Sequence, residues 1–306
     1  MRLVFAGTPQ VAADTLLQLL DRGRHDVVAV LTRPDAPQGR SARPVPSPVA
    51  TVALDRGIEV LRPVRPGDPD LATRLAELAP DCCPIVAYGG LIPPRLLALP
   101  GKGWVNVHFS LLPRWRGAAP VQHAILAGDQ VTGVTVFELV EDLDAGPVLA
   151  TRTYPLGGRE TSGEVLADLQ DIGAALLADT LDAVEDGTAT PVAQPVDGIT
   201  LAPKLTVPAA RIDWAQPAAA IDRQVRANNP SPMAWTDLHG ERLRVLRSAV
   251  GPDAGLAPGE IVPAKREVLV GTGEGSLALL EVQPAGRKSL PGPDWGRGLR
   301  GPRRLA

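Results

Sequence analysis

The sequence of 306 residues predicts an α/β protein with a Rossmann-like, mostly parallel sheet domain followed by a small β-barrel (OB-like) or sandwich domain. In the first half, short apolar runs alternate with helical patterns, which is typical of βαβ units in a sheet covered on both faces. A proline-rich stretch without periodicity comes after Gly187, and short strand patterns with turn signals follow it. The length also favours two domains over one.

The first half begins with a strand over 2–7, a helix over 12–23 and a strand over 26–32. Further along, we expect helices at 48–57, 70–80 and 162–187, and strands at 58–63, 81–90, 105–109, 132–140 and 147–156. The last two strands bracket an acidic loop. The strands are almost continuously apolar, so both of their faces should be covered.

The second half predicts a different architecture. One helical pattern covers 218–228, and short strands lie within 238–246 and 267–282. We therefore expect a catalytic domain over 1–187, a linker over 188–209 and a C-terminal domain over 210–306. The prolines and low periodicity of the linker predict few contacts across it.

Composition narrows the class of protein. No apolar run approaches the roughly 18 residues that span a bilayer, and the stretch from Met1 to Pro9 lacks the apolar core of a signal peptide. Cys82 and Cys83 are adjacent on a buried-looking strand, and offer neither a disulfide framework nor the spacing of metal ligands. We expect a cytoplasmic protein without a metal site.

Charge is distributed unevenly along the chain. The net charge of −3 divides into −8 over residues 1–203 and +5 over residues 204–306. A basic C-terminal third on an acidic body indicates a polyanionic partner, and Arg287 and Lys288 are candidate contacts in it. A solvated basic surface is the alternative interpretation.

Two polar residues interrupt an apolar strand. In the run from Val105 to Phe109, the period of two places Asn106 and His108 on one face. Polar groups on a buried strand cost stability unless they have partners, so these two are either satisfied core residues or a site. An amide N–H and an imidazole N–H on one face can both donate to an oxygen that acquires negative charge.

An acidic loop supplies a partner for the histidine. Asp144 precedes Ala145 and Gly146 in an apolar neighbourhood, whereas Glu141 and Asp142 fit a solvated turn. A carboxylate beside an imidazole orients it and raises its pKa, which makes a usable proton shuttle near neutral pH. We expect Asp144 to have that role for His108.

The first strand ends in a turn that faces the same edge of the sheet. The sequence "FAGTP" over 5–9 places Thr8 where open α/β folds hold ligands. It lacks the G-x-G-x-x-G pattern, so a dinucleotide site is not expected.

Together these residues carry a family resemblance. The stretch "NVHFSLLPRWRGAAP", followed 36 positions after His108 by Asp144 in "LDAG", resembles the 10-formyltetrahydrofolate-dependent formyltransferases. The segments "FAGTP", "PVPSPV", "SLLPRWRGAAPVQHAILAGD", "TGVTVFEL" and "RIDW…RANNPSPMAW" are similar to the branch that acts on methionyl-tRNA. The resemblance extends from the first strand to about Trp235 and continues weakly to the end.

The resemblance implies an activity and a set of site residues. The expected reaction transfers the formyl group of 10-formyltetrahydrofolate, a co-substrate, to the methionine amino group of initiator Met-tRNA for translation initiation, with a monomeric enzyme and no metal. The family's catalytic Asn, His and Asp correspond to Asn106, His108 and Asp144. Its folate-binding tetrapeptide corresponds to Ser110, Leu111, Leu112 and Pro113.

A loop after the second strand is expected to reach the tRNA acceptor end. The family's Gly-Arg pair corresponds to Gly39 and Arg40, but "GRSARP" replaces a more lysine-rich loop and leaves Arg40 and Arg43 as the cations. The segment "AYGGLIPP" also has Gly90 where many relatives have a longer polar residue. These departures concern contact detail and not the reaction.

Three alternative functions stay open on the sequence. A formyltransferase acting on an amino-sugar nucleotide or on glycinamide ribonucleotide is disfavoured by the "RWRGAAP" loop and the basic C-terminal region. A non-catalytic tRNA-binding protein is disfavoured, because the polar residues on buried strands would lower its stability without contributing to a reaction. A folate hydrolase, in which water replaces the amine, would need the same oxyanion donors.

Overall fold

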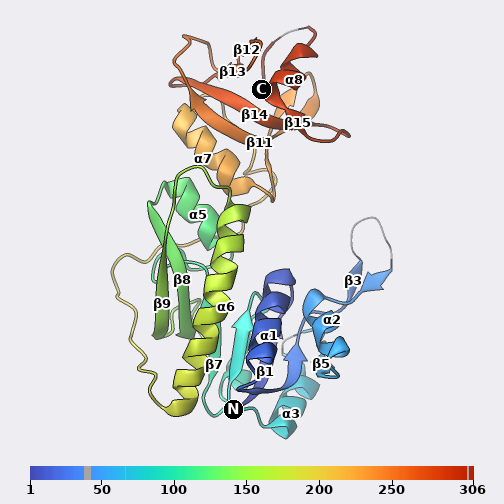
Figure 1. The fold of residues 1–306 in the computed structure, drawn as a ribbon, viewed down its shortest axis with the longest axis vertical. Coiled ribbons are helices and arrows are strands. Elements are labelled where there is room, and N and C mark those ends of the chain that lie inside the picture. The colour runs from blue at the N-terminus through green and yellow to red at the C-terminus, as the bar shows by residue number, and fades with distance from the viewer. Residues whose placement is uncertain (38–42, 66, 302) are drawn as a thin grey trace. The chain divides into compact units, whose positions relative to one another are not determined.

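The computed structural model describes residues 1–37, 43–65, 67–301 and 303–306, and the chain forms two compact units (Figure 1). The first unit combines Met1–Gly117, Thr132–Tyr154 and Ala167–Leu201. The second unit combines Ala118–Val131, Pro155–Leu166 and Ala202–Ala306. No helix in the described part of the chain is long and apolar enough to cross a membrane.

The N-terminal sheet has seven strands in the order β5-β2-β1-β6-β7-β8-β9. Five neighbouring strands from β5 to β7 are parallel, and β8 runs antiparallel to β7. The predicted mostly parallel sheet is therefore confirmed. The strands are β1 Arg2–Gly7, β2 Asp26–Leu31, β5 Glu59–Leu61, β6 Cys83–Val86, β7 Trp104–His108, β8 Val131–Glu138 and β9 Val148–Pro155.

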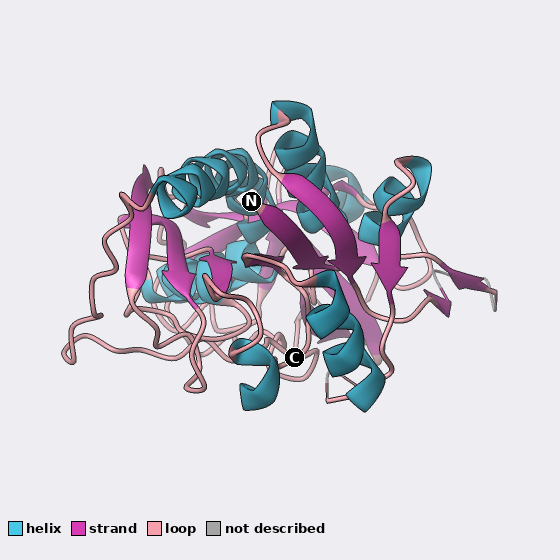
Figure 2. Cartoon of the chain, turned by 90° about the horizontal axis from the view of Figure 1, so that it is seen from below, coloured by secondary structure: helices cyan, strands magenta, loops and turns pink. Residues whose placement is uncertain are grey.

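Helices cover both sides of these strands (Figure 2). One face of the sheet packs Val4 and Ala6 of β1 with Leu75 of α3, Leu96 of α4 and Trp104 of β7 in a continuous core. The helices of this part of the chain are α1 Gln10–Arg22, α2 Pro48–Asp55, α3 Pro69–Leu78, α4 Pro94–Leu97 and α6 Ser162–Asp186. Two short strands, β3 Ala36–Pro37 and β4 Pro44–Val45, pair with each other outside the main sheet. Helix α2 begins at a side-chain cap, since the Ser47 hydroxyl accepts from Ala50 N.

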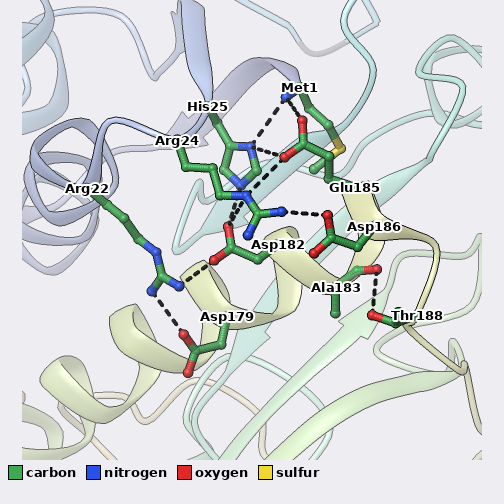
Figure 3. Close-up of polar contacts among 10 residues, drawn as sticks. All are labelled: Met1, Arg22, Arg24, His25, Asp179, Asp182, Ala183, Glu185, Asp186 and Thr188. Atoms are coloured by element: carbon green, nitrogen blue, oxygen red, sulfur yellow. Dashed lines mark hydrogen bonds and ion pairs between the residues drawn. The ribbon is translucent and has the colours of Figure 1, made fainter.

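An ionic cluster connects the start of the sheet to the end of α6 (Figure 3). The buried His25 imidazole lies 3.1 Å from the Asp182 carboxylate through Nε2, and the α-ammonium of Met1 lies 2.5 Å from Glu185. Arg24 pairs with Asp186 at 2.6 Å. The C-terminal end of α6 is thus joined by ion pairs to the residues that precede β1 and β2.

The second unit contains a six-stranded antiparallel sheet in the order β10-β11-β14-β13-β12, with β15 paired to β14. Its core includes Trp214, Ile221, Val245, Leu279 and Trp295. The predicted α/β fold with a second β domain is confirmed. The elements are α5 Pro120–Ala127, α7 Ala218–Asn228, β10 Ala234–Leu238, β11 Glu241–Gly251, β12 Ile261–Pro263, β13 Val268–Gly271, β14 Ser276–Pro284, β15 Leu290–Pro291 and α8 Gly292–Arg297.

The second unit is not simply the part of the chain after the predicted linker, because it also includes Ala118–Val131 and Pro155–Leu166. Helix α5 packs with α7, and the Arg223 side chain donates from Nε to the Leu126 carbonyl at 3.1 Å. A side-chain contact of this kind leaves no periodic signal in the sequence. The linker predicted over 188–209 is itself divided, with residues up to Leu201 in the first unit and those from Ala202 in the second.

Candidate active site

Asn106 and His108 lie on β7, the strand where the sheet changes from parallel to antiparallel. Asn106 pairs with Ile85 of β6 on one side and with Phe137 of β8 on the other. His108 is 6 % exposed, and Asn106 is half-buried. Within the described residues, nothing hydrogen-bonds the Asn106 amide, so both of its N–H donors are available to a ligand.

His108 is hydrogen-bonded through one ring nitrogen and faces a carboxylate with the other. Its Nε2 lies 2.8 Å from the Trp115 carbonyl, and its Nδ1 lies 3.7 Å from Oδ2 of Asp144. Because a carbonyl only accepts, Nε2 carries the proton in this arrangement. Nδ1 then faces the carboxylate, and a second proton on the imidazole would lie between these two groups.

The pKa of His108 is lowered, and burial is the largest cause. The charge of Asp144 and the hydrogen bond to Trp115 oppose this effect without cancelling it. The expected influence of Asp144 is present, but the prediction of a raised net pKa is wrong, because removing the imidazole from water penalises its charged form more. The imidazole is therefore neutral near pH 7 and can accept a proton.

Asp144 occupies a constrained turn after β8. Its φ of 47° lies in the left-handed region, and its Oδ2 accepts from Gly117 N at 2.7 Å. Two residues later, a Cβ on Gly146 would lie 1.7 Å from the Glu138 carbonyl, so this position of the turn requires glycine. Glu141 and Asp142 are exposed, as expected for a solvated turn.

The loop after β7 is shaped by internal hydrogen bonds. Ser110 Oγ donates to the Arg114 carbonyl at 2.6 Å. Thr135 of β8 donates from Oγ1 to the Ser110 carbonyl at 2.7 Å and accepts from Leu112 N at 3.1 Å. These bonds hold the backbone around Ser110, Leu111, Leu112 and Pro113, and they direct the following chain so that the Trp115 carbonyl reaches His108.

Gln194 is a site residue that the sequence analysis did not identify. Its Nε2 donates to the carbonyls of Asp144 and Gly146, at 2.8 Å each. Its Oε1 accepts from Arg116 through Nε at 3.2 Å and through Nη2 at 2.7 Å. One side chain therefore connects the Asp144 turn to the loop after β7.

Thr200 completes this connection. Its hydroxyl accepts from Trp115 N at 2.8 Å, and its carbonyl accepts from Arg116 N at 2.9 Å. Both Gln194 and Thr200 lie in the segment predicted as a linker, where neither spacing nor composition marks them.

The other predicted residues have separate positions. The Thr8 hydroxyl donates to the Tyr88 carbonyl at 2.8 Å, which gives it a structural role between the ends of β1 and β6. Arg40 lies outside the described residues, and Arg43 is exposed. Arg287 and Lys288 are exposed between β14 and β15.

The comparisons with known proteins agree along the chain. Residues 1–181 match the formyl transferase family, and residues 204–300 match the formyl transferase C-terminal domain. The methionyl-tRNA formyltransferase of Streptomyces coelicolor is 54% identical over 301 residues, which cover 98% of this chain and 97% of the relative. The enzyme of the same name from Mycobacteroides abscessus is 52% identical over 300 residues, covering 98% and 97%.

Solved structures share the fold at lower identity. The N-formyltransferase from Helicobacter canadensis has a TM-score of 0.69 at 14% identity and covers 92% of this chain and 98% of its own. HypX from Aquifex aeolicus, solved with tetrahydrofolic acid, has a TM-score of 0.63 at 21% identity and covers 95% and 46%.

Proposed function

The chain belongs to the formyltransferase family, and from this premise we propose that it transfers the formyl group of 10-formyltetrahydrofolate to methionyl-tRNA. The acceptor is the α-amino nitrogen of methionine on the initiator tRNA, and the product is N-formylmethionyl-tRNA for translation initiation. The observation that supports the proposal is the pair of His108 and Asp144, with Asn106 two residues before His108 on β7, in a chain that matches methionyl-tRNA formyltransferases over nearly its whole length.

The reaction needs a stabilised oxyanion and a route for one proton. The neutral amine attacks the formyl carbon and forms a C–N bond, and the formyl oxygen becomes negative in the tetrahedral intermediate. The Asn106 amide donates to this oxygen, and His108 joins it when its Nε2–H turns from the Trp115 carbonyl to the substrate. The bond to the folate nitrogen then breaks, and that nitrogen takes up a proton.

The pair of His108 and Asp144 carries the proton. The attacking nitrogen must lose a proton as the C–N bond forms, and neutral His108 can accept it at Nδ1, the nitrogen that faces Asp144, by relay through water. The imidazolium is stabilised by the Asp144 carboxylate 3.7 Å away, and the same proton can pass to the leaving nitrogen. Asp144 is an electrostatic partner in this scheme, and it remains ionised.

The folate and the tRNA bind to different parts of the chain. We assign folate binding to the loop of Ser110, Leu111, Leu112 and Pro113, whose backbone is held beside His108. The tRNA contacts are assigned to Arg40 and Arg43 at the acceptor end and to basic residues of the second unit, including Arg287 and Lys288.

The cellular setting follows from the proposed substrate. Because aminoacyl-tRNA is used in translation, we place the enzyme in the cytoplasm. One chain carries the catalytic set and the basic region, and we propose that it acts as a monomer.

The proposal is tested with 10-formyltetrahydrofolate labelled in the formyl group. Incubation with initiator Met-tRNA should move the label to the aminoacyl ester, and uncharged tRNA should take up none. Arg40→Ala should lower the ratio of kcat/KM for initiator over elongator Met-tRNA. Release of labelled formate at the same rate with and without Met-tRNA would indicate a hydrolase and refute the proposal.

A further inference from the structure

The α-nitrogen of Met1 lies among charged and polar groups of the first unit (Figure 3). It is 2.5 Å from Oε1 of Glu185 on α6 and 3.4 Å from Nδ1 of His25. The side chains of Met1 and His25 are 2 % and 3 % exposed, and that of Glu185 is 33 % exposed. The ammonium therefore has two partners, and one of them is almost completely removed from water.

The backbone and the side chain of Met1 fix the position of this nitrogen. The Met1 carbonyl accepts from Asp26 N at 2.9 Å, which extends the pairing of β1 with β2 by one residue. The buried thioether side chain holds the residue from its other side. A displacement that separated the nitrogen from Glu185 would disturb this pairing or bring the apolar side chain into water, and both cost free energy.

Only an ammonium serves both partners. It has three N–H donors and a positive charge, whereas the nitrogen of a formamide has one N–H and no charge. His25 can accept at Nδ1 because burial, and next the Met1 charge, lower its pKa and keep the imidazole neutral near pH 7. The hydrogen bond from the ammonium is the largest cause of the lowered pKa of Glu185.

The ammonium also contributes to the charge balance at the end of α6. In the part of the chain that the structure describes, three cations form ion pairs with four carboxylates here: Met1, Arg22 and Arg24 with Asp179, Asp182, Glu185 and Asp186. All four carboxylates lie on one helix, where like charges three or four residues apart repel. Without the ammonium, two cations would remain beside these four anions.

The carboxylate partner of the ammonium is made late. Glu185 lies 184 residues after Met1 in the sequence. At the usual speed of synthesis this stretch takes roughly 10–40 s. During that time Met1 has no Glu185 to pair with, so a group on its nitrogen is accessible to a hydrolytic enzyme until the end of α6 has been made.

We propose that Met1 is a modification site, at which the formyl group of the initiator methionine must be removed by hydrolysis and a retained formyl group destabilises the first unit. This inference rests on the proposed function, which makes formylmethionine the first residue of new chains. In the hydrolysis, the oxygen of water bonds to the formyl carbon and the C–N bond breaks. The formic acid that leaves gives its proton to the released amine, which becomes the ammonium beside Glu185.

The test compares the thermal unfolding of two forms of the full-length protein. Both are produced in a bacterial host, with and without an inhibitor of N-terminal deformylation, and the intact mass identifies the form that carries the additional CO. The formylated form should unfold at a temperature roughly 3–8 °C lower, because it lacks a hydrogen-bonded charge pair. Equal unfolding temperatures of the two forms would overturn the inference.

Two substitutions show whether the ion pair is the cause. Glu185→Gln removes the carboxylate that faces the ammonium, so the difference between the formylated and free forms should shrink to less than half. Asp179→Asn is the matched control, since Asp179 lies on the same helix and pairs with Arg22. In this variant the difference should keep its full size. A difference of unchanged size in Glu185→Gln would assign the effect to the bulk of the formyl group and refute the role of the ion pair.

Failure of the proposed function would be seen in a different assay. The host's own translation supplies the formyl group in both preparations, so a chain without formyltransferase activity would still give these unfolding data. Transfer of labelled formyl groups to Met-tRNA is measured separately with the free form.

Discussion

Gln194→Met is expected to lower the rate of formyl transfer without weakening substrate binding. The substitution keeps the length of the side chain and removes four hydrogen bonds: two donated to the carbonyls of Asp144 and Gly146, and two accepted from Arg116. Hydrogen bonds between neutral groups contribute about 0.5–1.5 kcal/mol each, and those to charged groups about 1.5–3 kcal/mol. The turn that carries Asp144 therefore loses a substantial part of its support.

The size of the rate decrease depends on how much of this hydrogen-bond free energy stabilises the transition state. If about 1.4–2.8 kcal/mol of it is lost in the transition state, the rate falls by about 10-fold to 100-fold. The loss should be in kcat, because Gln194 hydrogen-bonds the Asp144 turn and Arg116 and not the predicted folate loop. Steady-state formylation with saturating and limiting Met-tRNA separates kcat from KM.

Two further variants of the first unit sharpen this prediction. Gln194→Glu keeps an acceptor for Arg116 but loses both donors and places a negative charge beside two carbonyl oxygens, so it should be at least as impaired as the methionine variant. Gln10→Met is the control, since Gln10 is exposed and, among the residues that the structure describes, its side chain bonds only to Asp14 of the same helix. A kcat for Gln194→Met within twofold of the unaltered enzyme would show that the Asp144 turn does not need this side chain.

Replacing either oxyanion donor, Asn106→Ala or His108→Ala, should lower kcat by about 10²–10³-fold with little change in tRNA affinity, and near-normal turnover in either variant would remove it from the mechanism. Asp144→Asn should lower kcat at least as much in the same formylation assay, because it removes the charge that stabilises the imidazolium. Asp142→Asn should leave kcat nearly unchanged. The reverse result would mean that the wrong acid is assigned. Burial lowers the pKa of His25 below its ordinary value, so the unfolded chain binds more protons and stability should fall as pH decreases through the unfolded value of about 6.5. Thermal unfolding between pH 8 and pH 5 should show a weaker pH dependence for His25→Asn, and an unchanged dependence would exclude this linkage.

The sequence determined the sheet and the face of β7 that carries Asn106 and His108. The strands predicted over 2–7 and 26–32 correspond to β1 Arg2–Gly7 and β2 Asp26–Leu31, because near-continuous apolar runs are typical of strands that are covered on both faces. The period of two predicted that Asn106 and His108 share one face of β7. This prediction needs no tertiary information, because side chains alternate between the two faces of any strand.

The same local reasoning separated the acids of the turn after β8. Asp144 is buried beside His108, while Glu141 and Asp142 are exposed. The apolar neighbours and the glycine at 146 were enough to predict this, since a tight turn needs a residue without a side chain where the backbone comes close.

Only the tertiary structure decided what surrounds the imidazole. The Trp115 carbonyl is a backbone group, and the side chains of Gln194 and Thr200 lie in an irregular segment, so none of the three is marked by a periodic pattern. The direction of the His108 pKa shift could not be predicted from the sequence either. Desolvation depends on how completely the surrounding chain excludes water, and here it outweighs the neighbouring carboxylate, so a charge partner that the sequence predicted does not by itself determine the protonation state.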